Sequence, residues 1–285
     1  MANNLYGVCI VKNEADIITF SLTHASRFCK AIYVLDNGST DDTWERVTAL
    51  SARNPAIVPF EKKACRYGVG LRGYIYNRVR REFKEGDWVL ILDSDEFLEN
   101  DPEPDIAYCE GRGFELIFTL QAQFYVTPRD FEKPWYRKGH DSIDSFEVLP
   151  AHFQINYSEP RLFKHTSSLE WPDLDDRGNP TQISYPNGLG KRSPRKVVNR
   201  HYQYRSIPQM RQRLALRSRV HLETGRFKHN REEDFQTYIR DDRRLKSWQT
   251  GQQILPTPFD FFRLYLIKRS RRLRKIIADR TLLKR

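Results

Sequence analysis

The first hundred residues alternate between two hydrophobic patterns. Short apolar runs rich in β-forming residues predict buried strands at 5–11, 31–35, 56–60 and 88–92. Apolar residues at helical spacing and capping residues between these runs predict helices at 15–28, 41–52 and 74–84. Strands that alternate with helices indicate βαβ units. We therefore expect an α/β fold with a mostly parallel sheet flanked by helices.

The pattern changes after residue 100. Residues 114–126 predict one or two strands, whereas 127–200 are rich in proline, glycine, asparagine and charge, which favours long loops with a few antiparallel strands. Helices are predicted at 206–223, with Pro208 in the first turn, and at 234–248. The resulting division has three parts, which are 1–100, a loop-rich 101–205 and a C-terminal helical region at 206–285.

Composition narrows the class of protein. The chain of 285 residues is 39% hydrophobic, which is enough for a sizeable core, and its mean hydropathy of -0.70 indicates a heavily charged surface. No apolar run approaches the ~18 residues that span a bilayer, and the N-terminus does not have the pattern of a secretory signal, so we expect a cytoplasmic protein. The four cysteines include no close pair, which argues against a zinc site built on cysteine.

The net charge of +11 is concentrated at the C-terminus. Residues 261–285 contain ten lysines and arginines against Asp279 alone, so the rest of the chain is nearly balanced and we expect no nucleic-acid partner. Aromatic and aliphatic residues alternate with the basic ones in this tail. A basic amphipathic helix suits an anionic membrane surface, which predicts peripheral contact at the inner face of the membrane. A solvated helix that packs one face on the body is the alternative.

Three polar loops follow predicted strands, at 12–14, 36–38 and 93–95. In parallel sheets the carboxyl ends of strands meet at one edge, where ligands bind, so these loops should face one crevice. Asp93 and Asp95 at positions i and i+2 of an extended chain point the same way. Oxygen ligands suit Mg²⁺ or Mn²⁺, and such a cation neutralises a diphosphate leaving group.

The same spacing occurs a second time, at Asp173 and Asp175. No strand is predicted before that copy, so its context favours the first copy as the metal site. A turn that caps a helix is the alternative interpretation of Asp93 and Asp95.

The three loops resemble a known family. The segments 11–14, 34–41 and 87–97 look like the three signature segments of glycosyltransferase family 2, in the subgroup with V-x-N-E and D-x-D-E-F motifs. The resemblance covers about residues 5–100. It implies a GT-A fold and a metal-dependent transfer, with inversion, from a nucleotide-diphosphate-sugar donor to a glycan or lipid-linked acceptor. The implied cofactor is Mn²⁺ or Mg²⁺. Residues 1–100 would then bind the nucleotide sugar, and 101–205 the acceptor.

The resemblance also implies roles for single residues. The base and ribose would be held by Lys12, Asn13, Glu14 and Asp36. Two residues look similar to positions before the key strand of the family, Arg72 and Asn77, and Arg72 is expected to pair with the diphosphate. At the strand end, the ribose and metal would be contacted by Asp93, the donor by Ser94 and the metal directly by Asp95.

The second half offers weaker candidates. GT-A enzymes often complete the metal site with a late histidine, and His201 before the helix at 206–223 is the best candidate; a histidine satisfied in the core or at the surface is the alternative. An inverting enzyme needs a carboxylate that deprotonates the acceptor. We favour Glu170 or Asp173, because Trp171 beside them could stack on a sugar, with a solvated acidic loop as the alternative.

Two other functions stay open. A nucleotidyltransferase on a related fold would need a basic, glycine-rich phosphate loop after the first strand, and residues 12–16 are too acidic for that. A protein without catalysis could act through its basic tail as a membrane-binding or nucleic-acid-binding module.

Overall fold

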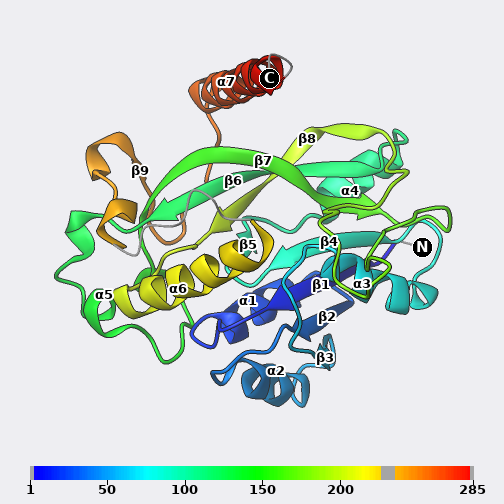
Figure 1. Ribbon diagram of the computed structural model, residues 1–285, viewed down its shortest axis with the longest axis horizontal. Helices are drawn as coiled ribbons and strands as arrows, with labels where there is room; N and C mark the ends of the chain where they lie inside the picture. Colours follow the sequence, from blue (N-terminus) through cyan, green and yellow to red (C-terminus); the bar gives the residue numbers. More distant parts are fainter. Residues whose placement is uncertain (1–2, 226–234, 283–285) are drawn as a thin grey trace.

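The computed structural model describes residues 3–225 and 235–282, with side chains described up to residue 270. It has a mixed α/β architecture built on one sheet, in the strand order β3-β2-β1-β4-β7-β6-β8-β5, with β9 beside β7 (Figure 1). The first four strands are parallel neighbours, as the alternating pattern predicted. They are β1 (Leu5–Val11), β2 (Ala31–Asp36), β3 (Ile57–Lys62) and β4 (Trp88–Asp93).

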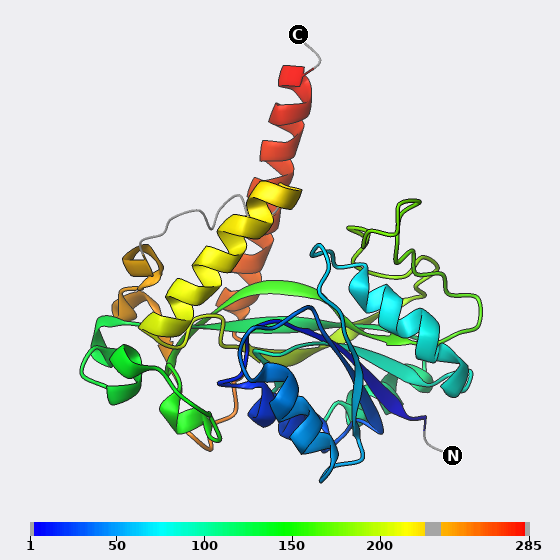
Figure 2. The same ribbon diagram turned by 60° about the horizontal axis from the view of Figure 1, so that its bottom comes forward.

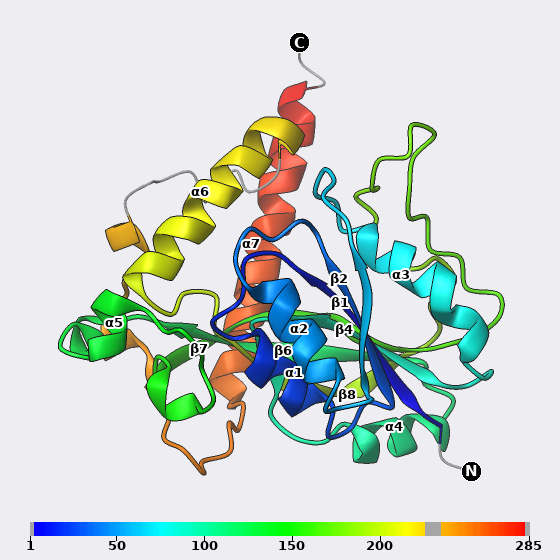
Figure 3. The same cartoon turned by 90° about the horizontal axis from the view of Figure 1, so that it is seen from below.

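Helices cover both faces of this parallel part. The helices are α1 (Ile18–Ala25), α2 (Thr43–Ser51), α3 (Leu71–Val79) and α4 (Glu103–Glu110). Residues of α1, α2 and α4 share one core with Cys9 and Leu90, whereas α3 packs on the opposite face with Val8 and Ile91. Because successive strand residues point to opposite faces, the near-continuous apolar runs of β1 and β4 supply both cores. Figure 3 shows α1 and α2 side by side.

The remaining strands extend the same sheet with mostly antiparallel pairings. They are β5 (Glu96–Leu98), β6 (Leu116–Tyr125), β7 (His152–Lys164), β8 (Arg192–His201) and β9 (Lys246–Ser247). β7 runs antiparallel to β4 and β6, as expected, but β8 runs parallel to β6. β5 pairs antiparallel with β8 in a register that sets Glu96 opposite His201. The acidic turn after β4 is thereby joined to the end of β8.

The C-terminal helices agree in part with the sequence pattern. α6 (Ile207–Thr224) is capped by Ser206, whose Oγ accepts a hydrogen bond from the Gln209 backbone N–H, and the helix matches the one predicted at 206–223. The helix predicted at 234–248 is wrong over the described residues from 235 onward, which form two 3₁₀ turns and β9. There, the Asp241 carboxylate accepts the Arg243 N–H, a local bond that competes with a helix.

The last helix, α7 (Pro258–Leu282), is long and projects away from the sheet (Figures 1 and 2). A short helix, α5 (Pro134–Lys138), lies between β6 and β7 in the chain. Leu264 is buried at its base, and Arg263 donates to Asn156 of β7 at 2.8 Å. None of the helices in the described part of the chain is both long and apolar enough to span a membrane.

Candidate active site

The carboxyl ends of β1, β2 and β4 border a cavity of about 810 Å³. The predicted site residues that line it are Lys12, Asn13, Glu14, Arg72, Asp93, Ser94, Asp95 and His201. One wall comes from α6, an element that the sequence did not connect with the site; it contributes Gln209, Gln212, Arg213, Leu216, Arg217 and Val220. The volume lies within the range of cavities that enclose small ligands.

Two predicted donor-binding residues do not line this cavity. Asp36 is fully buried beneath it, and its Oδ1 accepts the Ser39 N–H at 2.6 Å, which shapes the turn after β2. The next residue, Asn37, reaches the cavity instead. Asn77 on α3 donates to the Trp171 carbonyl at 2.8 Å. Both side chains therefore hold the walls in place in this conformation.

The two predicted base residues also lie outside the cavity lining. Glu170 is exposed, and Asp173 accepts from Arg78 at 3.1 Å. Trp171 between them is 2% exposed and packs against α3, where a Cβ at Gly73 would meet its ring at 2.8 Å. The indole is thus a core group here and does not offer a face to a sugar.

The loop after β1 is held to the loop after β2. Asn13 is the one non-glycine residue with positive φ in the described part of the chain, at 55°. Ser39 Oγ accepts its N–H at 2.9 Å, its Oδ1 accepts the Thr40 N–H at 2.8 Å, and Lys12 donates to the Asn37 carbonyl at 2.9 Å. Such over-determined backbone conformations are characteristic of functional sites, so this loop is a preorganised part of the cavity.

Asp93 is held by two arginines. Its oxygens accept from Arg72 at 2.6 Å and from Arg161 of β7 at 2.8 Å. Burial alone would raise the pKa of Asp93, but the charges of Arg161 and Arg72 hold it well below its usual range. Arg161 also contacts the buried Glu96 at 2.5 Å, whose pKa burial raises to about 7. Arg161 is a site residue that the sequence did not identify.

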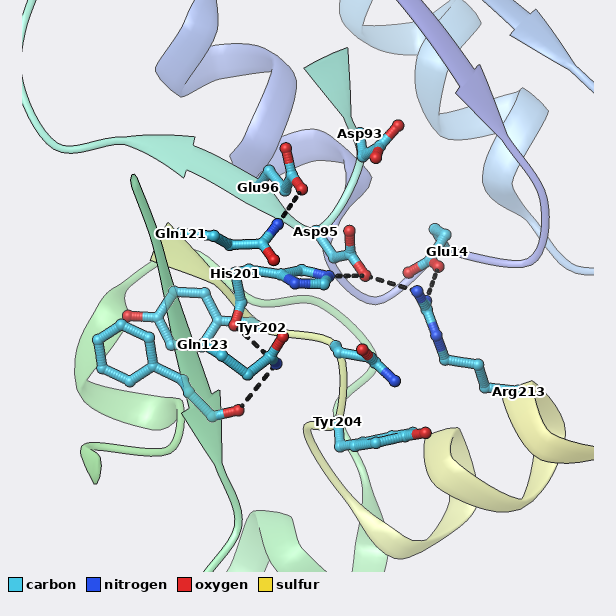
Figure 4. Close-up of polar contacts among 12 residues, drawn as sticks. Glu14, Asp93, Asp95, Glu96, Gln121, Gln123, His201, Tyr202, Tyr204 and Arg213 are labelled. Atoms are coloured by element: carbon cyan, nitrogen blue, oxygen red, sulfur yellow. Dashed lines mark hydrogen bonds and ion pairs between the residues drawn. The ribbon is translucent and has the colours of Figure 1, made fainter. Parts of the chain in front are cut away.

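Asp95 lies between two cationic partners (Figure 4). Its Oδ2 is 2.8 Å from Arg213 Nη2 and 3.4 Å from His201 Nε2, and its side chain is only 4% exposed. Burial opposes ionisation of Asp95, yet Arg213 and His201 keep its pKa well below the ordinary value. Burial lowers the pKa of His201, and Asp95 more than reverses that effect, so the net shift is upward.

Glu14 connects the first loop to the second half of the chain. Its Oε1 accepts from Arg213 at 2.6 Å and its Oε2 from Arg205 at 2.6 Å. Arg205 is fully buried and also binds Asp16 at 2.7 Å. Burial raises the pKa of Glu14 in spite of both arginines. The acidic groups of this site thus depend on guanidinium groups from β7 and α6 and from the segment between β8 and α6.

Asp95 and His201 are the residues that fit a divalent cation. Asp95 Oδ2 has ion-pair contacts but no hydrogen bond of good geometry, and His201 Nδ1 is buried without a partner. The 3.4 Å between Asp95 Oδ2 and His201 Nε2 is close to the ~3 Å between neighbouring ligands of an octahedral ion. Within the described residues no group of three His, Cys, Asp or Glu side chains surrounds one point, so diphosphate oxygens and water would supply the other ligands.

The cavity carries more positive than negative charge. Its described lining has six lysines and arginines, which are Lys12, Arg66, Arg72, Arg213, Arg217 and Arg219. The carboxylates are Glu14, Asp93, Asp95 and Glu223. An excess of cations in a concave site attracts a polyanion such as a diphosphate.

No protein-family model and no curated protein sequence matches this chain. Among solved structures, it is similar to a mannosyltransferase from Pyrobaculum calidifontis in complex with GDP-Man and Mn²⁺, with TM-score 0.39, 15% identity, and coverage of 79% of this chain and 65% of that one. For S. aureus TarS 1–349 the TM-score is 0.39, the identity 13%, and the coverage 81% and 70%. For M. tuberculosis glucosyl-3-phosphoglycerate synthase the TM-score is 0.28 and the identity 24%, and the match covers 43% of this chain and 45% of that one. Scores this low do not establish a function, which depends on the site itself.

Proposed function

We propose that the protein is a metal-dependent glycosyltransferase that moves a sugar from a nucleotide-diphosphate-sugar donor to a glycan or lipid-linked acceptor. One observation carries the proposal. The cavity at the carboxyl ends of the parallel strands combines Asp95 and His201 with an excess of arginines. A cation site beside an anion site is what the diphosphate of a nucleotide sugar requires.

The donor would lie along the loops after β1 and β2. Asn13 and Asn37 offer amide groups to a base and ribose, and Lys12 and Arg72 offer positive charge to phosphate oxygens. Arg72 and Arg161 keep Asp93 ionised and oriented. Asp95 and His201 would hold Mn²⁺ or Mg²⁺, which neutralises the charge of the departing diphosphate.

A thermal-shift experiment tests this proposal. The full chain would be heated with UDP-, GDP-, ADP- and dTDP-linked sugars, each with Mn²⁺ or with EDTA. Binding to the native state alone must raise the melting temperature. We expect a rise with at least one nucleotide sugar and Mn²⁺, and a smaller rise in EDTA. If no nucleotide sugar raises it under either condition, the protein is not a glycosyltransferase of this kind.

Inversion requires a base, and Glu170 and Asp173 stay the proposed candidates. They belong to the loop after β7, which contacts the start of α3 through the hydrogen bond from Gly70 N–H to the Thr181 carbonyl. Once a donor is identified, Glu170→Gln and Asp173→Asn should be compared with Asp175→Asn, an exposed residue of the same loop. A loss of about a hundredfold in kcat from one of the first two identifies the base. Full rates from both would place the base elsewhere.

Contact with a membrane is the second part of the proposal. The first turns of α7 expose Phe259, Phe261, Phe262, Tyr265 and Leu266. Basic residues surround them, and this combination suits the surface of an anionic bilayer, where a lipid-linked acceptor would lie. We expect the chain to sediment with vesicles of phosphatidylglycerol and not with phosphatidylcholine alone. Phe262→Glu with Tyr265→Glu should abolish sedimentation and leave donor binding unchanged; sedimentation that persists would contradict this contact.

A further inference from the structure

Arg213 of α6 lies between two carboxylates of different loops (Figure 4). Its Nη1 is 2.6 Å from Glu14 Oε1 and its Nη2 is 2.8 Å from Asp95 Oδ2. The three side chains are 17%, 9% and 4% exposed, respectively. The guanidinium group therefore connects the loop after β1 with the acidic turn after β4 in a site largely closed to water.

The same Asp95 oxygen faces His201 Nε2, the other residue that fits a divalent cation. A guanidinium group and a divalent cation at one oxygen would place like charges within a few ångströms of each other. In a buried site that repulsion is weakly screened, so each of the two charges weakens the binding of the other at that oxygen. Arg213 and the cation must compete for Asp95.

We propose that Arg213 is an internal counter-ion of the cation site, which a divalent metal displaces from Asp95 and which then binds the diphosphate. The competition for Asp95 stands on the geometry alone; the identity of the anion rests on the proposed function. The exchange leaves no carboxylate unpaired, because Glu14 keeps Arg205 at 2.6 Å and Asp95 gains the metal.

The rest of the α6 wall favours such an exchange. Arg217, which also lines the cavity, has its pKa lowered to about 10 by burial and by Arg213. This crowding of positive charge is relieved when an anion enters beside the helix. Removal of Arg213 should therefore have opposite effects on the two ligands, with tighter binding of the metal and weaker binding of the anion.

The first measurement is Mn²⁺ binding to the full chain by electron paramagnetic resonance, without nucleotide. Arg213→Met should bind Mn²⁺ about tenfold more tightly than the wild type, with Arg213→Lys in between. The matched control is Arg211→Met, an exposed arginine of α6 that lies over the Phe235 ring, and it should change the affinity by less than about twofold. Circular dichroism would show that each variant is folded; if Arg213→Met is not, Arg213→Lys decides.

The second measurement is the binding of inorganic pyrophosphate by calorimetry to protein saturated with Mn²⁺, where Arg213→Met should bind about tenfold more weakly. A role in folding alone would weaken both ligands, which would overturn the proposal. So would Mn²⁺ binding to folded Arg213→Met no tighter than to the wild type. These outcomes leave the thermal shifts with nucleotide sugars untouched, so this inference and the proposed function fail separately.

Discussion

The acidic and the basic groups of the site come from different parts of the chain. Residues 5–100 supply Glu14, Asp93 and Asp95 on loops after parallel strands. Most of their counter-charges come from beyond residue 150, and these are Arg161, His201, Arg205 and Arg213. The first region contributes the carboxylates at one edge of the sheet, and the second supplies most of the positive charges that act on their pKa values. Three variants and one pH series test this division of roles, from the largest expected effect to the smallest.

The largest effect is expected from Asp95→Asn. The amide keeps the shape but loses the charge that attracts both a cation and Arg213. Sugar transfer should fall by about a thousandfold, and Mn²⁺ should no longer raise the melting temperature. The control is Asp175→Asn at the second Asp-x-Asp, which should retain both properties. Equal losses in the two variants would mean that strand context does not select the site.

Arg161→Met tests the contribution of the second region to stability. Arg161 is 3% exposed and contacts Asp93, Glu96 and Glu159 within 2.8 Å. Its loss removes the ion-pair partner of the buried Glu96 and one of the two arginines on Asp93, which should lower the free energy of unfolding by about 3–5 kcal/mol, as measured in urea. Adding Glu96→Gln should restore part of that loss. A decrease below about 1 kcal/mol would show that these acids do not need Arg161.

His24 tests a buried titratable group of the first region. Burial and then Arg27 lower the pKa of His24 from 6.5 to about 4, and its Nε2 is 2.9 Å from the Leu98 carbonyl. Between those pH values the unfolded chain binds more protons than the folded one, so stability should rise with pH across the window. Unfolding free energies measured from pH 4 to pH 7 should show that rise, and His24→Gln should flatten it. If the free energy of unfolding rises with pH just as steeply in His24→Gln, other titratable groups cause the rise.

The smallest effect is expected from Arg78→Ala. Arg78 and Asp173 also join the two regions, at 3.1 Å, but their side chains are 42% and 23% exposed. Water screens such a pair, so the loss in unfolding free energy should stay below about 1 kcal/mol in the same urea titration. A loss as large as that of Arg161→Met would show that burial is not what separates the two contacts.

The first region was predictable because its signals are local. The apolar runs of β1 and β4 predict these strands without any information from distant residues. The polar loops that follow them meet at one edge because the two strands are parallel neighbours. The strands β7 and β8 were expected only as a few antiparallel strands, because β8 presents charged residues on a half-exposed face. Its buried Arg200 pairs with Glu99, a partner that lies 101 positions away, and lies over the rings of Phe146 and Trp248.

Arg72 was predicted as a site residue and lines the cavity, but the other arginines that pair with the carboxylates of the site were not predicted, because their partners are distant in the sequence. Arg161, Arg205 and Arg213 meet their carboxylates across 68, 189 and 199 positions of sequence, respectively. The sequence of α6 contains several arginines and does not indicate which of them points into the site. Arg161 lies between Pro160 and two apolar residues, Leu162 and Phe163, which is the one local sign of a buried cation among these three. His201 was named from its position before a helix, and the structure brings it to the cavity.

The pairing of β5 with β8 bears on how this protein can diverge. Glu96 lies opposite His201, and the Tyr202 N–H donates to the Asp95 carbonyl at 2.9 Å, so main-chain bonds fix the spacing of Asp95 and His201. The loops at 126–151 and 165–191 lie outside that pairing. Under the proposed function, insertions and deletions there could change acceptor recognition without shifting the register of the proposed cation site. Descendants of this sequence could then change their acceptor while they keep the proposed donor site.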